Sequence, residues 1–439
     1  MTGQAVPLAA IVTTDLCAVT RGRFLPSDRI EAAAQTGIGW VPANISLRPD
    51  GQIVADNPWG SSGDLRVLPD LKARAVTGLT GAPTPFDMTP GDIVTLDGQP
   101  WPACTRAALK AAVAAFEAET GLRLLASFEQ EFQLLETGLP EAHVFSFRAL
   151  RRAEPFAGRY FGALQEAGTD PEVIIAEYGR DQYEITSGPT DPLTAADRAV
   201  IIREITHEMA RIGGWRATFA PKTHPEAAGN GVHIHFSLVD AAGAPAGFDA
   251  GLPGRLSPVA ASFCGGILDH MPAILALTAS SPSSYLRLRP HNWSSAWTWL
   301  GECDREASLR ICPTVEIGGR DPARQFNVEY RAADATANPY LALAALIHAG
   351  LDGIRRRRAA PPVFSGDPEA LTEAERQALG LRRLPISLEA ALAALREGAA
   401  KDWFAPELLA SFAGVKRDEC AAAAGRDDVG NCALCARYY

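Results

Sequence analysis

The chain has 439 residues, of which 47% are hydrophobic and 21% are charged, and its formal net charge is −10. This composition is typical of a soluble globular protein with more than one domain. The negative net charge argues against nucleic-acid binding. The most apolar long stretch, near 258–278, contains Asp269, His270 and Pro272, which argues against a membrane span.

Eight cysteines are scattered along the chain, and the N-terminus shows no signal-peptide pattern. A chain of this size does not need disulfides for stability, so we expect reduced thiols and a cytoplasmic location. Cys432 and Cys435 form a single CxxC motif, but a zinc site usually needs a second ligand pair. The motif by itself therefore does not predict a zinc site.

The first hundred residues predict a small β-rich domain. Residues 8–14 and 21–26 are expected to form strands joined by a turn, and residues 37–100 are rich in Gly, Pro and Asp. The segment 97–102 is the expected linker. The predicted domains therefore span residues 1–100 and 101–439.

Helical patterns dominate after residue 105. Arg106 to Thr120 is amphipathic and Gly121 is a helix stop. Further helices are expected at 195–212, 258–278, 338–357, 387–397 and 405–413. Strands are expected at 122–135, 183–187, 215–220, 231–239 and 326–332. The second domain is therefore predicted to be α+β, with one large sheet and helices packed on one face.

The stretch 231–238 carries two of the eight histidines. Alternate residues of a strand point to opposite faces, so His233, His235 and Ser237 share one face and apolar residues share the other. Two solvated histidines on a half-buried strand are the alternative interpretation of this stretch alone.

Three other stretches also place carboxylates on one face of a predicted strand. The acids on these predicted strands are Glu129, Glu131, Glu177, Glu184 and Glu329. Neighbouring carboxylates repel one another, and a cation among them removes that cost. Oxygen ligands with limited imidazole suit Mg²⁺ or Mn²⁺ better than zinc. An exposed strand face is the alternative interpretation of any one pair.

Arginines accompany these acids at positions 287, 305 and 310. Arginine neutralises developing charge in phosphoryl transfer and binds carboxylates through two parallel hydrogen bonds. A surface salt bridge is the alternative for any one of them. The sequence has no Walker-type glycine loop and no GxGxxG motif after a strand, so a nucleotide site has to be of another kind.

Seven motifs, in order and in spacing, resemble the glutamine synthetase family over nearly the whole chain. They are FEQEF (128–132), EYGRDQYE (177–184), ATFAPK (217–222), GNGVHIHFS (229–237), SSYLRL (283–288), DREASLR (304–310) and NVEYRAADATANPY (327–340). The resemblance implies a small β-grasp domain followed by a catalytic domain with a large antiparallel sheet flanked by helices. It also implies a homo-oligomeric ring, often a dodecamer, with active sites between adjacent subunits.

The resemblance further implies ATP and two or three divalent metal ions as cofactors, held by named residues. The metal nearest the acid and the attacking amine would be held by Glu131, Glu177 and Glu184. The metal that bridges the ATP phosphates would be held by Glu129, His233 and Glu329.

The resemblance assigns the remaining polar residues to the substrates. The nucleotide would contact His235 and Ser237, with Arg310 on its phosphates. Arg305 would stabilise the phosphoryl group during transfer. The carboxylates of a glutamate-like acid would be bound by Arg287 and Arg331.

Departures from the family pattern concern the substrates. Ammonium-using members carry an Asp-Gly-Ser-Ser motif in the small domain and a glutamate after the Arg-Leu of the SYKRL-like motif. Here residues 39–45 contain no aspartate and residues 289–294 contain no acid. A small cation needs nearby negative charge, whereas Trp40 and Trp293 in these stretches favour a larger, more apolar amine.

Two smaller departures from the family pattern lie in other motifs. The usual Asn-Gly pair before the histidine strand is Ala228-Gly229 here. In the family that asparagine contacts the amino-acid substrate, so the acid bound here, with Gly229 as a candidate contact, is glutamate or an analogue. The usual Asn-Arg of the nucleotide motif is Asp304-Arg305.

We therefore expect an ATP- and Mg²⁺- or Mn²⁺-dependent ligase. It would join the γ-carboxylate of glutamate, or of a close analogue, to an organic amine through an acyl phosphate. Glutamine synthetase acting on ammonium is one alternative, and a non-catalytic structural or regulatory relative is another. The retained glutamates argue against the non-catalytic alternative.

Overall fold

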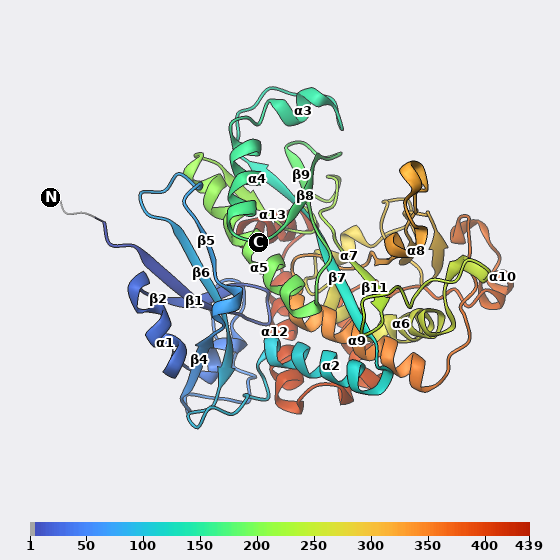
Figure 1. Ribbon diagram of the computed structural model, residues 1–439, viewed down its shortest axis with the longest axis horizontal. Helices are drawn as coiled ribbons and strands as arrows, with labels where there is room; N and C mark the ends of the chain where they lie inside the picture. Colours follow the sequence, from blue (N-terminus) through green and yellow to red (C-terminus); the bar gives the residue numbers. More distant parts are fainter. Residues whose placement is uncertain (1–4) are drawn as a thin grey trace.

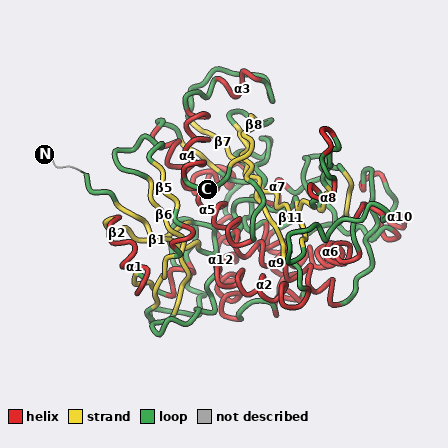
Figure 2. The backbone as a smooth tube through the Cα atoms, in the orientation of Figure 1, coloured by secondary structure: helices red, strands yellow, loops and turns green. Residues whose placement is uncertain are grey.

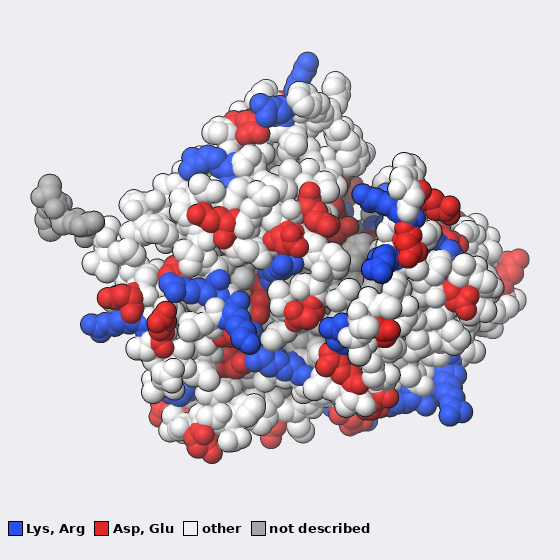
Figure 3. All heavy atoms as spheres, in the orientation of Figure 1, with Lys and Arg blue, Asp and Glu red and all other residues white. Residues whose placement is uncertain are grey.

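The computed structural model describes residues 5–439 and contains two β-sheets in separate parts of the molecule (Figure 1). The small sheet belongs to the N-terminal part of the chain, drawn in blue, and the large sheet to the rest. Helices surround the large sheet, whereas strands dominate the N-terminal part (Figure 2). Acidic and basic side chains are interspersed over the visible face (Figure 3).

The small sheet has strand order β2-β1-β6-β4-β3, and β5 pairs with β6. Its strands are β1 (Leu8–Thr14), β2 (Thr20–Pro26), β3 (Ile38–Trp40), β4 (Leu65–Pro69), β5 (Ala75–Thr77) and β6 (Phe86–Val94). All pairs are antiparallel except β1 with β6, which is parallel. The predicted β-rich N-terminal domain is present in this form.

The large sheet has strand order β12-β13-β14-β11-β7-β9-β8, and β10 pairs with β7. Its strands are β7 (Arg123–Leu135), β8 (Pro171–Ala176), β9 (Gln182–Ser187), β10 (Arg216–Thr218), β11 (Val232–Val239), β12 (Leu300–Glu302), β13 (Leu309–Ile311) and β14 (Val328–Tyr330). Every pair is antiparallel except β12 with β13. The predicted α+β class and its antiparallel sheet are confirmed.

Helices account for most of the remaining chain. They are α1 (Ile30–Thr36), α2 (Thr105–Thr120), α3 (Phe147–Arg151), α4 (Phe156–Glu166), α5 (Pro192–Ile212), α6 (Pro258–Thr278), α7 (Ser284–Arg287), α8 (Pro322–Gln325), α9 (Pro339–Arg355), α10 (Glu373–Ala378), α11 (Leu388–Glu397), α12 (Pro406–Ala423) and α13 (Asp428–Tyr438). Periodicity predicted α2, α5, α6, α9 and α11 closely. It missed α4 and α13, and α12 ends ten residues later than the predicted helix 405–413.

The apolar face of the large sheet packs on α2 and α6. The ring of Phe236 on β11 lies 5.3 Å from that of Phe263 on α6, which in turn lies 5.8 Å from Phe116 on α2. Helix α6 is long and apolar enough to cross a membrane, but 72% of its most apolar window is buried. It touches α9 backbone to backbone, since a Cβ on Gly266 would lie 2.7 Å from the Gly353 Cα. Helix α6 is therefore a packed core helix.

A buried arginine at the start of α2 joins the two domains. Arg106 is 2% exposed, and its guanidinium contacts Asp70 at 2.8 Å and Asp92 at 3.1 Å in the small domain. It also donates two hydrogen bonds, of 3.0 and 2.8 Å, to Asp197 on α5. The Tyr340 hydroxyl donates a third bond to Asp197 at 2.6 Å. Three carboxylates thus converge on one cation between the domains.

Replacing Arg106 with methionine should destabilise the protein strongly. The change leaves Asp197 buried without its cation, and breaking a buried ion pair costs about 3–5 kcal/mol. Urea denaturation followed by circular dichroism should show a clearly lower midpoint. Arg324→Met, which removes an arginine that is 73% exposed, is the control and should leave the midpoint unchanged. Equal midpoints for both variants would contradict this account.

Candidate active site

The sheet register brings the predicted histidine and glutamate strands side by side. Glu129 on β7 lies directly opposite His233 on β11, and His235 lies opposite Glu329 on β14. Directly opposed residues project from the same face of a sheet. These four side chains therefore form one continuous polar face, while the other face of β7 and β11 is packed on the helices.

The first group of possible metal ligands consists of Glu129, His233 and Glu329, whose ligand atoms all lie within 4.8 Å of one another. The His233 Nδ1 is 3.1 Å from a Glu129 carboxylate oxygen and 3.3 Å from a Glu329 oxygen. The three side chains thus surround one small volume on the polar face.

The second group consists of Glu131, Glu184 and His233, with ligand atoms again within 4.8 Å. Glu184 on β9 lies opposite Glu131, whose carboxylate accepts the Gly231 N–H at 3.0 Å. Glu177, expected in this group, directly follows the last residue of β8, Ala176, and stays outside the 4.8 Å cluster. His233 belongs to both groups and lies between them.

Crowding of these acids changes their ionisation. Burial, followed by repulsion from Glu129, raises the pKa of Glu184 to about 10. Burial also raises the pKa of Glu131 to about 7, with a further contribution from Glu177. Burial opposes ionisation of Glu129 as well, but the charge of His235 holds the Glu129 pKa well below its usual range. The positive charge near Glu131 and Glu184, which includes Arg287 and Arg331, is therefore too small to offset their burial and mutual repulsion.

The donor set fits hard divalent cations. Four carboxylates and one shared imidazole offer mostly oxygen ligands, which Mg²⁺ and Mn²⁺ prefer. A divalent cation beside Glu131 and Glu184 would supply the charge that keeps both ionised.

Arginines border the polar face at Glu329. Arg310 donates to one Glu329 oxygen at 2.8 Å, and Arg331 pairs with the other. Arg331 also donates to the Arg305 carbonyl at 3.0 Å and to the Trp293 carbonyl at 3.3 Å. The structure thus places Arg310 and Arg331 on a predicted metal ligand, and Arg331 ties two loops to it.

The other two arginines carry free donors. Arg287 is 3% exposed and bonds the Ala333 carbonyl at 2.7 Å, but its Nε has no partner. The guanidinium of Arg305 is exposed and forms no ion pair within residues 5–439. Gly229 lies against Arg287, because a Cβ there would be 2.7 Å from the arginine Cγ. A buried cation with an unsatisfied N–H suits an anionic ligand.

Comparison with known proteins identifies this arrangement. Residues 102–428 match the model of the glutamine synthetase catalytic domain, and residues 2–101 match that of the glutamine synthetase N-terminal domain. The chain belongs to the glutamine synthetase family. It is a carbon–nitrogen ligase, and enzymes of this family use ATP and a divalent metal. The resemblance inferred from the seven motifs is confirmed.

Individual relatives of this glutamine synthetase family member cover almost the whole chain. A gamma-glutamylpolyamine synthetase of Streptomyces coelicolor is 35% identical over 98% of this chain and 93% of its own. A glutamine synthetase of Thermococcus kodakarensis is 30% identical over 88% of this chain and 82% of its own.

Two solved structures are similar to this chain over almost its whole length. A structure described as a novel glutamine synthase homolog has a TM-score of 0.91 and 44% identity, with both chains fully covered. A GmaS/ADP complex has a TM-score of 0.79 and 26% identity, over 97% of this chain and 95% of its own.

The residues predicted to lie along a nucleotide extend the polar face of this family member toward the far end of β11. His235 Nδ1 lies 2.8 Å from the Asn327 side-chain oxygen, and the Ser237 hydroxyl donates to the Phe326 carbonyl at 2.8 Å. The Cys312 thiol lies 3.7 Å from His235 Nδ1. Motif reasoning did not single out Asn327 or Cys312, although each lies two residues from a predicted site residue on β14 or β13.

Gln182 is a third residue that motif reasoning did not assign. Its side-chain N–H donates to Glu131 at 3.2 Å, to the Gly229 carbonyl at 2.8 Å and to Asn230 at 2.9 Å. It lies two residues before Glu184 and on the same strand face, so the alternation of β9 could have indicated it. Gln182 joins the second ligand group to the loop before the histidine strand.

The two predicted tryptophans have opposite environments. Trp40 ends β3 in the small sheet and is 5% exposed, so within one chain it is a core residue and not part of the polar face. Trp293 is 67% exposed on the loop that Arg331 holds. The structure therefore brings Trp293, but not Trp40, to the site of the same chain.

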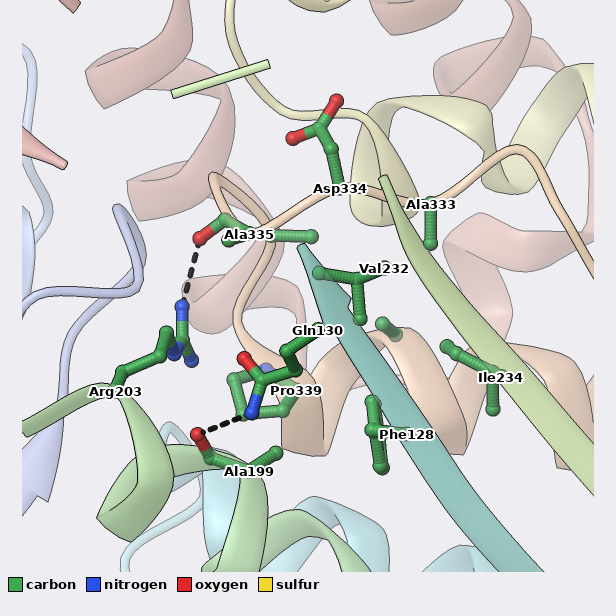
Figure 4. Close-up of a pocket in the computed structure, with 12 residues that line it drawn as sticks. Phe128, Gln130, Ala199, Arg203, Val232, Ile234, Ala333, Asp334, Ala335 and Pro339 are labelled. Atoms are coloured by element: carbon green, nitrogen blue, oxygen red, sulfur yellow. Dashed lines mark hydrogen bonds between the residues drawn. The ribbon is translucent and has the colours of Figure 1, made fainter. Parts of the chain in front are cut away.

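A small void lies behind the polar face and is distinct from the site (Figure 4). Its volume of about 10 Å³ has room for about one water molecule. Gln130, between the two site glutamates but on the other face of β7, donates to the Ala199 carbonyl at 2.9 Å there. Arg203 donates to the Ala335 carbonyl at 2.7 Å. These bonds fix β7 and the segment after β14 to α5, and thereby support the site.

The raised pKa of Glu184 predicts how stability depends on pH without metal. Its carboxyl ionises near 4.5 when unfolded but near 10 when folded, so the folded state retains a proton across this range. Stability is therefore greatest below the unfolded value and is lost as the pH rises toward the folded one. The EDTA-treated protein should unfold at progressively lower temperature between about pH 6 and about pH 9.

Glu184→Gln removes this proton linkage and should flatten the dependence on pH. Thermal unfolding of the EDTA-treated variant and parent checks the prediction, with Glu172→Gln, an exposed change on β8, as control. Adding Mn²⁺ should restore stability to the parent at high pH. A parent whose unfolding temperature is flat across this range would contradict the prediction.

Proposed function

We propose that this protein joins the γ-carboxylate of glutamate, or of a close analogue, to an organic amine at the cost of ATP. A carboxylate oxygen bonds to the terminal phosphorus of ATP, and ADP leaves. The amine nitrogen then bonds to the acyl carbon, the carbon–oxygen bond to phosphate breaks, and the amine gives up a proton. The observation that carries the proposal is a family metal face beside an acid-free loop, 289–294.

Arg287 is the proposed anchor for the acid substrate. Its Nε is buried and has no partner. Its aliphatic stem lies against Gly229, and its Nη1 lies near Gly231, the residue whose N–H donates to Glu131 of the second ligand group. A carboxylate is the ligand that best satisfies such a donor. Arg331 is already paired with Glu329, so we assign it to holding the Trp293 and Arg305 loops as well as to the acid.

The two ligand groups define the proposed metal sites, and the nucleotide is assigned to residues that adjoin them. We propose one divalent ion at Glu129, His233 and Glu329, and one at Glu131 and Glu184 with Glu177 completing it. These ions would neutralise phosphate charge and polarise the reacting oxygens. His235 and Ser237 would lie along the nucleotide, and Arg310 would contact its phosphates.

The amine side distinguishes this chain from an ammonium-using enzyme. A small cation must be held and deprotonated by nearby acids, and loop 289–294 offers none. It offers instead the indole of Trp293, which is 67% exposed. The gamma-glutamylpolyamine synthetase relative of Streptomyces coelicolor supports an organic amine as the substrate.

We also propose a homo-oligomeric ring, a dodecamer, in the cytoplasm. In such a ring the small domain of one subunit would close the site of the next, and Trp40 would belong to that closure. All eight cysteines are free thiols, which suits a reducing compartment. Light scattering after size-exclusion chromatography would measure the assembly.

An amine panel tests the proposed function. Purified protein with Mg²⁺, ATP and glutamate should release phosphate with organic amines and much more slowly with ammonium. Mass spectrometry of the product should show the γ-glutamyl amide. Ammonium outperforming every organic amine would establish glutamine synthetase instead, and no phosphate release with any amine would favour the non-catalytic relative.

Arg305→Lys should lower kcat while leaving the KM for ATP nearly unchanged. The exposed guanidinium is proposed to contact the phosphoryl group only during transfer, and loss of one such donor costs about a hundredfold to a thousandfold in kcat. Steady-state phosphate release measures both constants. The control is Arg324→Lys, an exposed arginine on α8, and an equal effect of both changes would refute the assignment.

A further inference from the structure

A cavity of about 360 Å³ adjoins the proposed site on the side of loop 289–294. Three chain segments line it, namely 290–299, 304–306 and 366–369. We call it the tryptophan cavity after its three indoles, Trp293, Trp297 and Trp299. This volume falls in the range of small-molecule pockets.

One arginine connects the wall of the tryptophan cavity to the metal face. Arg331 donates to the carbonyl of Trp293 at 3.3 Å and to that of Arg305 at 3.0 Å, and it pairs with Glu329. Trp293 lines the cavity, and Arg305 lies between two lining residues, Asp304 and Glu306. The wall of the tryptophan cavity is therefore connected to the metal face through the contacts of Arg331.

The loop that carries Trp293 is held in an unusual conformation. His291 and Trp293 have φ of 62° and 50°, a left-handed region that costs non-glycine residues about 1–3 kcal/mol. The Glu306 carboxylate accepts both backbone N–H groups, at 3.2 and 2.5 Å. This acid holds the Trp293 side chain at the cavity while leaving it 67% exposed.

The cavity lining is strongly acidic. Four carboxylates line it, from Asp304, Glu306, Asp367 and Glu369, and among the lining residues only His291 can carry positive charge. Arg376 and Arg383 stack on Trp297 from outside the lining, at 5.0 and 5.6 Å from the ring centroid. Indole faces together with carboxylates are the chemistry that recognises an organic ammonium group.

We propose that the tryptophan cavity binds the distal ammonium group of a diamine or polyamine substrate. This rests on the proposed function, because the other amine of that substrate is the one that attacks the acyl phosphate. The attacking nitrogen has to be uncharged, and the distal nitrogen keeps its proton because carboxylates favour the charged form. Loop 289–294 of this chain thus lacks the acid proposed for the reacting nitrogen of ammonium-using enzymes, whereas acids surround the proposed site of the distal nitrogen.

Two of the carboxylates can be neutralised without removing their hydrogen bonds. Asp367 accepts the Glu369 N–H at 2.9 Å, and Glu369 accepts the Trp297 indole N–H at 2.8 Å. Asn and Gln retain an oxygen acceptor at each position, so Asp367→Asn/Glu369→Gln removes charge while preserving the local contacts. The control Asp402→Asn/Glu407→Gln removes two exposed charges elsewhere, neither of them in an ion pair within residues 5–439.

The substrates 1,4-diaminobutane and n-butylamine form a matched pair that differs in the second amine. For the parent, 1,4-diaminobutane should have the lower KM in phosphate-release assays. The cavity double variant should raise that KM at least tenfold and leave the KM for n-butylamine and both kcat values within about twofold. The control variant should change neither. A double variant that affects both amines equally, or neither, would overturn the proposal.

Binding without turnover separates this proposal from the proposed function. Calorimetry of the parent with 1,4-diaminobutane alone should show heat that is lost in the double variant and retained in the control. Phosphate release from the parent with n-butylamine tests only the ligase activity. If n-butylamine reacts but the double variant binds 1,4-diaminobutane as the parent does, the ligase stands and the cavity assignment falls.

Discussion

Repulsion among buried carboxylates is the constraint on which the rest of this structure depends. Glu129, Glu131, Glu184 and Glu329 share one face of the large sheet, with His233 at their centre. Positive charge reaches this face unevenly. Arg310 and Arg331 neutralise Glu329, whereas Glu131 and Glu184 have raised pKa values. A divalent cation beside Glu131 and Glu184 would supply the positive charge that this side of the face needs, and enzymes of the family use a divalent metal.

The sheet tolerates the repulsion among these carboxylates because its other face is packed tightly. Phe128, Gln130 and Phe132 alternate with the two glutamates on β7 and are almost fully buried. Helix α5 accepts the Gln130 amide, and α6 packs against β11. The strands therefore hold the carboxylates in place through burial and hydrogen bonds on the opposite side of the sheet.

Substrate choice is a property of loops and not of this sheet. The metal face lies on the sheet of the catalytic domain, while loop 289–294 carries Trp293 and no acid. Arg331 connects the loop to the metal face, since the same side chain pairs with Glu329 and donates to the Trp293 carbonyl. A change of amine can thus evolve in the loop while the phosphoryl chemistry stays fixed.

Much of this protein was determined by sequence alone, because strand alternation is local. The period of two placed Glu129 with Glu131, and His233 with His235, on common faces, and β7 and β11 have those faces. The family motifs then identified the fold and the ligase class. Helix α13 escaped prediction because its amphipathic pattern is weak and packing on the rest of the domain stabilises it. Helix α4 was also missed, although its sequence is clearly amphipathic.

Tertiary structure decided what depends on register and on distant segments. Pairing of β7 with β9 put Glu184 beside Glu131, whereas Glu177, which directly follows the last residue of β8, stayed outside the cluster. Trp40 and Trp293 both lie in stretches that depart from the family motifs, yet Trp40 ends β3 and is buried in the small sheet, whereas Trp293 is exposed at the site. The tryptophan cavity joins segments more than sixty residues apart, and local sequence carries no record of such contacts.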